Sequence, residues 1–166
     1  MISTIGYEKA NLSDFIRTLE VCDVEVLVDI RDRAQSRRPG FSKSALSAAV
    51  GEVGINYIHV KALGDPKEGR DAARSGDFAL FQRIFSDVLN TDVAQDALMQ
   101  VKELAKSYNI CLMCYERDQR ECHRKIVAEK LEELLGCKAR HVGVQKFASK
   151  PSTERRVLHT HQSAAA

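Results

Sequence analysis

Cysteine, histidine and carboxylate side chains gather in one short segment of the sequence, CYERDQRECHR, from Cys114 to Arg124. Cysteine attacks as its thiolate, so a neighbouring base makes it a candidate nucleophile. Cys114 has two candidate bases nearby, Glu116 and His123. Cys122 has basic neighbours and lies near the start of a predicted helix, which should lower the pKa of its thiol. The alternative is structural: both cysteines fill the core, His123 is a buried structural histidine, and Arg124 pairs with Glu116.

A second cluster is the basic segment RDRAQSRRPGFSK, residues 31–43. It holds five basic side chains and one acidic one, a net charge of +4. Guanidinium forks bind phosphate or carboxylate in bidentate geometry. The helix predicted to begin after Ser42 adds free N–H groups, which also favour anions. We therefore expect a bound anion here, and a solvated basic loop is the alternative. The side chains expected to hold the anion are those of Arg31, Ser36, Arg37, Arg38 and Lys43, together with Cys122 and Arg124 of the first segment.

A zinc site that joins Cys111, Cys114, Cys122 and His123 is not predicted, although the spacing resembles one. Zinc-binding CxxC pairs sit on turns, where both sulfurs converge. Here the pair lies in a predicted strand, where residues three apart point to opposite faces. The same placement argues against a thioredoxin-like pair, which belongs at the start of a helix. We therefore predict neither a metal nor a cofactor.

Alternating strands and helices must position these side chains. Five short apolar segments predict strands, at residues 3–5, 24–30, 55–60, 109–115 and 139–144. The second is almost continuously apolar, which is typical of a strand buried on both faces of a parallel sheet. Amphipathic segments between the strands predict helices. The expected fold is a three-layer α/β domain with a mostly parallel sheet of about five strands and helices on both faces.

Domain boundaries follow from the same pattern. One domain is expected over residues 1–144, followed by a basic and flexible tail at 145–166. The connection at residues 62–76 is charged and contains glycine, so we expect a loop. Its side chains Lys67, Arg70 and Arg74 would either close over an anion as a lid or remain solvated.

Polar residues follow several of the predicted strands at the point where each strand ends. In open α/β sheets, ligands bind beyond the carboxyl ends of the strands. The first strand is followed by Gly6, Tyr7 and Glu8, which we expect to line the site. Asp29 and Arg31 end the second strand, two residues apart and thus on one face. Asp29 is therefore a further acid–base candidate.

Composition limits the classes of protein. The chain has 166 residues and a formal net charge of +2, so attraction to phosphate must come from local clusters rather than from the whole molecule. No apolar run approaches the roughly 20 residues that cross a bilayer, and we see no secretory signal. Five cysteines, an odd number, argue against a secreted disulfide framework. We expect a cytoplasmic protein with reduced thiols and no membrane partner.

Six motifs occur in a fixed order: TIGYE, LVDIR, SRRPGFSK, GINYIH, LGDPKEGR and CYERDQRECHR. Together they resemble the bacterial and archaeal family catalogued as domain of unknown function 488, over about residues 1–135. The resemblance implies an α/β domain but supplies no activity. One departure is Ala34, where we expect a proline. The recurrent polar positions that the resemblance implies are Gly6, Tyr7, Glu8, Asp29, Arg31, Ser36, Arg37, Arg38, Cys114, Glu116, Cys122, His123 and Arg124.

Three hypotheses for function remain at this point. The first is a small enzyme, a hydrolase or group transferase, that acts on a phosphorylated or nucleotide-like anion with Cys114, Glu116, His123 and Asp29 as catalytic candidates. The second is a nucleic-acid-binding module, against which stands the low aromatic content of 6%. The third is a thiol-based redox sensor that uses Cys114 and Cys122. The sequence leaves the ligand, the reaction and the oligomeric state open.

Overall fold

The computed structural model describes residues 1–147 and shows an α/β fold built on one five-stranded sheet. Every strand pair is parallel, and the order across the sheet is β3-β2-β4-β1-β5. This confirms the fold class predicted from the sequence. The strands are β1 (Ile2–Gly6), β2 (Val26–Asp29), β3 (Asn56–His59), β4 (Ile110–Cys114) and β5 (Arg140–Val142).

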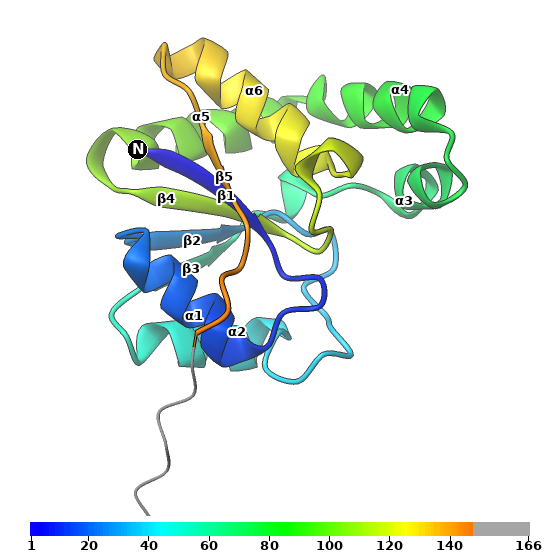
Figure 1. Cartoon of the computed structure of the whole chain (residues 1–166). Helices are drawn as coiled ribbons and strands as arrows, with labels where there is room; N and C mark the ends of the chain where they lie inside the picture. The colour runs from blue at the N-terminus through cyan, green and yellow to red at the C-terminus, as the bar shows by residue number, and fades with distance from the viewer. Residues whose placement is uncertain (148–166) are drawn as a thin grey trace, which may run out of the picture.

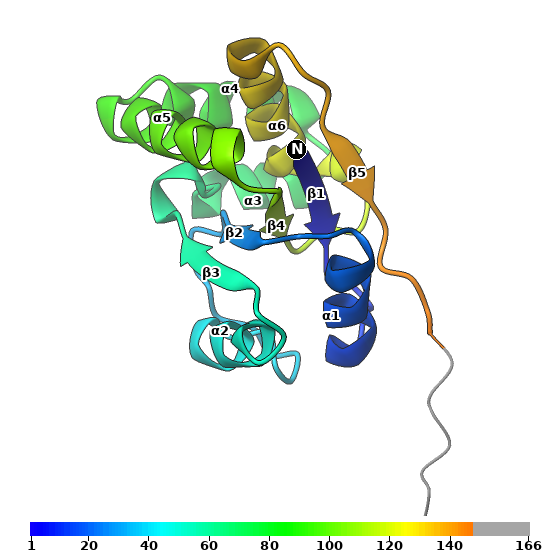
Figure 2. The same cartoon turned by 90° about the vertical axis from the view of Figure 1, so that its left-hand side faces the viewer.

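Helices cover both faces of the sheet (Figures 1 and 2). One face carries α1 (Leu12–Val21) and α2 (Lys43–Gly51). The other carries α3 (Lys67–Arg74), α4 (Phe78–Leu89), α5 (Asp92–Ser107) and α6 (His123–Leu135). Two short 3-10 helices, η1 (Lys61–Leu63) and η2 (Gln119–Glu121), lie in the connections.

Strand side chains alternate between two hydrophobic clusters, one on each side of the sheet. Leu27 and Met113 pack with Phe15 of α1 in the first cluster. Val28 and Leu112 belong to the second cluster, with residues of α3 to α6. This alternation decides which face of the sheet each functional side chain can reach.

The charged connection at 62–76 is not the loop that the sequence predicted. It contains η1 and then α3, whose buried residues are Gly69 and Ala72. An inward face made of such small residues leaves no apolar periodicity, so the pattern gave no sign of a helix. The capping pair Asp118 and Glu121 indicates a helix that starts at Asp118, but Asp118 caps the 3-10 helix η2 and α6 begins only at His123.

The end of the described chain is attached to α1. The backbone N–H of Gln145 donates to the Thr18 hydroxyl at 3.0 Å, and that of Phe147 donates to Asp14 Oδ1 at 3.0 Å. Residues 145–147 are therefore bound to the domain, and the rest of the tail lies outside the described residues. Within residues 1–147, the structure contains no helix with the length and apolarity that a bilayer crossing requires.

Candidate functional site

The strand order places Cys114 at a topological switch point. β4 lies between β2 and β1. The chain leaves β1 and β2 for helices on one face of the sheet, and it leaves β4 for α6 on the opposite face (Figure 1). Such a reversal opens a crevice beyond the carboxyl ends of the strands. Cys114, the last residue of β4, lies at that crevice.

The Cys114 thiol contacts both of its candidate bases. Its sulfur lies 3.3 Å from Glu116 Oε2 and 3.7 Å from His123 Nδ1. The Cys122 sulfur lies 3.9 Å from the same ring nitrogen. On the far side of the ring, Nε2 lies 2.9 Å from the carbonyl oxygen of Ile30. Since a carbonyl only accepts, Nε2 carries a proton and the other nitrogen faces the two sulfurs.

Burial and neighbouring charges set the protonation of this cluster. Burial alone lowers the pKa of His123, but the Cys122 sulfur, the Ile30 carbonyl and the Asp65 carboxylate outweigh it and raise the pKa to about 9. Burial raises the pKa of Glu116, but its contact with Cys122 and the nearby His123 ring lower it below the ordinary value. Glu116 is therefore an ionised carboxylate beside the Cys114 thiol at neutral pH.

The two cysteines are thiols in this environment. A hydrogen bond with Cys122 lowers the pKa of Cys114, but burial and the Glu116 carboxylate raise it above the ordinary value. Burial and the neighbouring Cys114 raise the pKa of Cys122 well above the ordinary value. The predicted lowering for Cys122 was wrong, because the side chain is 2% exposed and desolvation outweighs the helix terminus.

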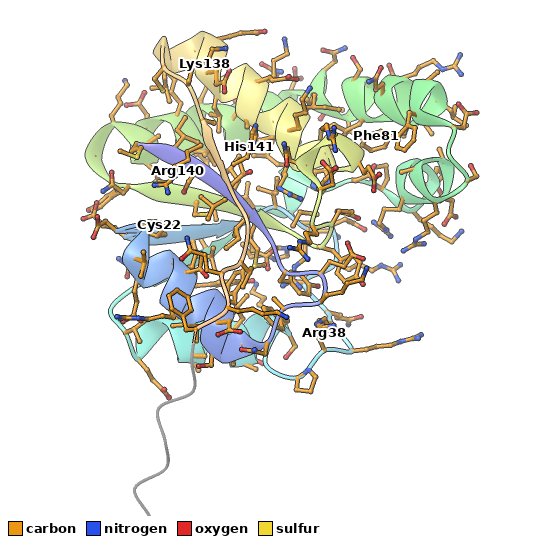
Figure 3. The ribbon with its side chains drawn as sticks, in the orientation of Figure 1. Cys22, Arg38, Phe81, Lys138, Arg140 and His141 are labelled. Atoms are coloured by element: carbon orange, nitrogen blue, oxygen red, sulfur yellow. The ribbon has the colours of Figure 1, made fainter. Side chains whose placement is uncertain are left out.

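A cavity of about 720 Å³ opens above Cys114, and arginines form much of its lining. Arg33 and Arg37 are exposed and have no side-chain partner within residues 1–147, so their guanidinium groups are free to bind an anion. Ser36 lines the same wall. Arg38 is partly committed, since its Nη2 donates to the Ala10 carbonyl. Figure 3 shows Arg38 on the loop that follows β2.

Arg31 and Asp29 form a structural pair on the opposite face of the sheet from Cys114. The guanidinium donates to both Asp29 oxygens, at 2.8 and 2.6 Å, and also to Tyr7 and the Phe41 carbonyl. Asp29 is fully buried and accepts a further bond from the Tyr57 hydroxyl. The structure therefore does not bring Asp29 to the thiol, and the Arg31 fork is occupied within the protein.

Arg124 holds the loop that follows β4. Its side chain is 1% exposed, and it donates to the backbone carbonyls of Glu116 and Arg117. Gly6 lies directly under this loop: a Cβ atom there would be 1.8 Å from the Glu116 carbonyl oxygen. Gly6 and Arg124 thus position Glu116 rather than bind an anion. Glu8 has a similar role, since its Oε2 accepts the Arg117 N–H at 3.1 Å.

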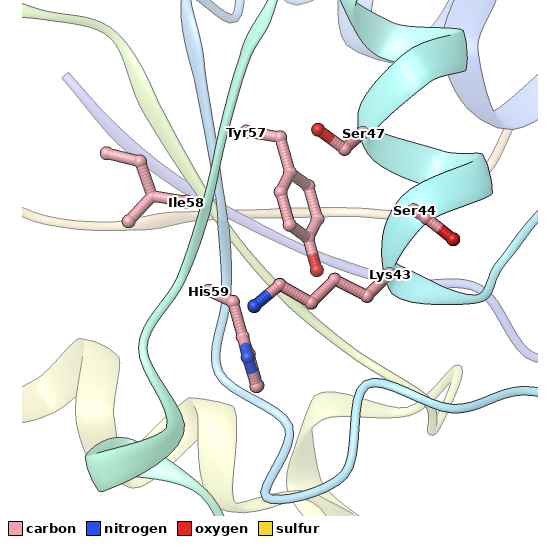
Figure 4. Close-up of a pocket in the computed structure, with 6 residues that line it drawn as sticks. All are labelled: Lys43, Ser44, Ser47, Tyr57, Ile58 and His59. Carbon is pink, nitrogen blue, oxygen red and sulfur yellow. The ribbon is translucent and has the colours of Figure 1, made fainter.

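Tyr7 lines the cavity, whereas Lys43 does not. The Tyr7 ring stacks on Phe41 with ring centroids 4.5 Å apart. Lys43 begins α2 and lines a separate cavity of about 610 Å³ with Tyr57 and His59 (Figure 4). Its backbone N–H donates to the Ala34 carbonyl, which closes the arginine loop. The structure therefore does not place the Lys43 side chain with the arginines.

Asp65 is a site residue that the sequence analysis missed. It is 4% exposed, and its Oδ1 atom is buried without a hydrogen-bond partner. Burial raises its pKa to about 6, although His123 and Arg70 oppose the shift. It lines both the large cavity and a neighbouring one of about 130 Å³. The signal for it in the sequence is the motif LGDPKEGR, which contains this aspartate.

Two arginines of the expected lid also line both cavities. Arg70 donates to Asp32 at 3.2 Å and to the Asp65 carbonyl, and Arg74 pairs with Asp71 on α3. Lys67 is exposed and pairs with Asp71 instead. Phe81 of α4, which Figure 3 labels, also lines the smaller cavity.

The cysteines divide between the two faces of the sheet. Cys111 lies in the hydrophobic cluster on the face that carries α1 and α2, so the expectation that it points away from Cys114 is confirmed. However, Cys114, Cys122 and His123 converge without it, and their ligand atoms lie within 4.8 Å of one another. The sequence predicted no metal site, and the residues that converge are a set of three rather than the four whose spacing resembles a zinc site.

Comparison with known proteins supports the resemblance. A family model described as domain of unknown function DUF488 matches residues 11–131. The chain belongs to this family. The matched region contains the arginine loop, Asp65 and the segment from Cys114 to Arg124, whereas Gly6, Tyr7 and Glu8 precede it. Neither the comparison with curated proteins nor that with solved structures finds a match.

The buried pair predicts a large stability loss when it is broken. Replacing Arg31 by methionine leaves the Asp29 carboxylate buried and uncompensated, which should lower the free energy of unfolding by about 3–5 kcal/mol. Arg17→Met, which breaks an exposed pair with Glu20, should leave it close to that of the wild type. Urea unfolding of both variants measures the difference. A near-wild-type Arg31→Met protein would contradict the structural role.

The close approach at Gly6 predicts a second effect. Gly6→Ala forces the Glu116 backbone away, and overpacking of this kind costs about 1–3 kcal/mol or more. Gly51→Ala is the matched control, because a Cβ atom there meets nothing within 4 Å. Thermal unfolding should show a lower melting temperature for Gly6→Ala and an unchanged or higher one for Gly51→Ala. Equal melting temperatures would mean that the loop is not held against Gly6.

Proposed function

We propose that this protein is a small enzyme, a hydrolase or group transferase, that acts on a phosphorylated or nucleotide-like anion with Cys114 as nucleophile. One observation carries the proposal. The Cys114 sulfur lies at the floor of an arginine-lined cavity and 3.3 Å from the Glu116 carboxylate. A nucleophile, its base and an anion-binding wall thus meet in one concave place, which is the usual arrangement of an active site.

Arg33 and Arg37 hold the anion in this proposal. Both are free of side-chain partners within the described residues, and both line the cavity. A guanidinium binds two phosphate oxygens at once, which fixes the orientation of the ligand as well as its charge. Ser36 adds a hydroxyl on the same wall.

Glu116 accepts the proton of Cys114 as the sulfur attacks the ligand. The Oε2 atom already lies within hydrogen-bond distance of the thiol, and His123 stabilises the charge that develops on sulfur. Asp65, whose pKa burial raises to about 6, is protonated in a minor fraction of the protein at neutral pH, and that form supplies a proton to the leaving group. Water or a second substrate then releases the group bound to sulfur. Asp29 takes no part, since its bonds are made within the protein.

The proposal predicts a specific ligand-induced stabilisation. We would melt the protein with inorganic phosphate, mononucleotides, nucleotide sugars, ADP-ribose, and single- and double-stranded oligonucleotides. A small anion at one hundred times its Kd should add about 2.7 kcal/mol, which for this size is a rise of roughly 5–10 °C in Tm. Arg37→Ala should abolish the rise. Arg83→Ala, which removes an exposed arginine of α4, should keep it.

Turnover of the ligand found in this way then tests the chemistry. Cys114→Ser and Glu116→Gln should each remove it, whereas Cys137→Ser, which changes an exposed cysteine, should not. Full turnover in both site variants would refute the assignment of the nucleophile. A shift of Tm by oligonucleotides alone would instead favour the nucleic-acid-binding hypothesis, which stays a prediction.

A further inference from the structure

Three metal-binding side chains converge below the cavity with the spacing of tetrahedral zinc ligands. His123 Nδ1 lies 3.7 Å from the Cys114 sulfur and 3.9 Å from the Cys122 sulfur. Zinc binds sulfur at about 2.3 Å and nitrogen at about 2.0 Å, so such ligands lie about 3.5 Å apart around a tetrahedral ion. The two observed separations are close to this value, so small side-chain movements are enough to admit an ion.

A fourth ligand is close by. Glu116 Oε2 lies 3.3 Å from the Cys114 sulfur, close to the edge of a zinc tetrahedron. The carboxylate lies outside the group of three residues whose ligand atoms are all within 4.8 Å of one another. Rotation of the Glu116 side chain toward Cys122 and His123 would bring in a carboxylate oxygen, a common zinc ligand, and complete a four-coordinate site.

The orientation of His123 is an independent sign of metal binding. Its Nε2 atom is held by the Ile30 carbonyl at 2.9 Å, so the Nδ1 atom faces the two sulfurs and can bind a metal ion that displaces its proton. Histidines that bind metals almost always donate their other N–H to a carbonyl or carboxylate, which fixes the ring and raises its basicity. Packing of the ring on Phe85, with centroids 5.0 Å apart, restrains it further.

We propose that Cys114, Cys122, His123 and Glu116 bind one Zn²⁺ ion. Two soft thiolate ligands favour zinc over the hard ions Mg²⁺ and Ca²⁺. The cysteines and the histidine are each no more than 5% exposed, so the bound ion is closed off from water. Cys114 lines the large cavity and Cys122 the smaller one, which gives the ion a route to the site.

Zinc and the proposed reaction exclude each other. An ion that occupies the Cys114 sulfur blocks its attack on a ligand, so stoichiometric zinc should inhibit turnover and a chelator should restore it. This consequence rests on the proposed function, whereas the binding of the ion does not. A metal-binding measurement therefore separates the two proposals.

Cobalt is the direct probe, because Co²⁺ replaces zinc and is coloured. The reduced wild-type protein should bind one Co²⁺ ion, with intense thiolate-to-cobalt charge-transfer absorption and tetrahedral ligand-field bands, and added Zn²⁺ should abolish both. Cys137→Ser should behave as the wild type. Cys122→Ser should lose the spectrum and bind at least about 100-fold more weakly, since loss of a group that merely orients a ligand costs up to that factor.

Alkylation of the wild-type protein gives a second test, which needs no variant and so does not depend on whether a variant folds. One equivalent of Zn²⁺ should protect Cys114 and Cys122 from alkylation, as read by peptide mass spectrometry, and leave the exposed Cys137 reactive. Cys114 and Cys122 that are alkylated equally fast with and without zinc, or a cobalt spectrum that persists in Cys122→Ser, would overturn the zinc site. Cobalt binding in a protein that turns over no ligand would overturn only the proposed function.

Discussion

The site depends on the buried guanidinium of Arg124. This side chain reaches from α6 to the loop after β4 and donates to the Glu116 and Arg117 carbonyls. Burying a charge is costly unless it is well hydrogen-bonded. Movement of the loop would leave the buried Arg124 guanidinium without these two hydrogen bonds, so the loop is held in place. Glu116 is thereby held beside the Cys114 thiol, and the glycine at position 6 leaves room for its backbone.

The two faces of the sheet position different parts of the candidate site. On the face that carries α1 and α2, the Asp29–Arg31 pair fixes the start of the arginine loop, with the guanidinium also bound to Tyr7 and Phe41. On the opposite face, α6 brings His123 to Cys114. Because β4 lies between β1 and β2 and is followed by a helix on the opposite face from theirs, the arginine-lined wall and the thiol meet at its carboxyl end. The fold thus holds Cys114 between Glu116 and His123 and leaves the Arg33 and Arg37 guanidinium groups unpaired within the described residues.

Sequence patterns predicted the strands and the parallel sheet well, because buried parallel strands are continuous apolar runs such as residues 24–30. They failed where a residue's role depends on contacts and burial that form only in the folded chain. Arg31 was expected to bind an anion, but its guanidinium donates to both carboxylate oxygens of Asp29. Asp65 looked like part of a polar loop, yet α3 buries it. The pKa of Cys122 depends on desolvation, which no local motif reports.

The central claim is that a reactive thiol lies beneath an anion-binding wall, and charged alkylating agents test it most directly. The rates at which iodoacetate and the neutral iodoacetamide label Cys114 would be compared by peptide mass spectrometry, with the exposed Cys137 as internal reference. The ratio of the iodoacetate rate to the iodoacetamide rate should be higher at Cys114 than at Cys137, and both inorganic phosphate and Arg37→Ala should reduce it. An unreactive Cys114, or the same ratio at both cysteines, would contradict the claim.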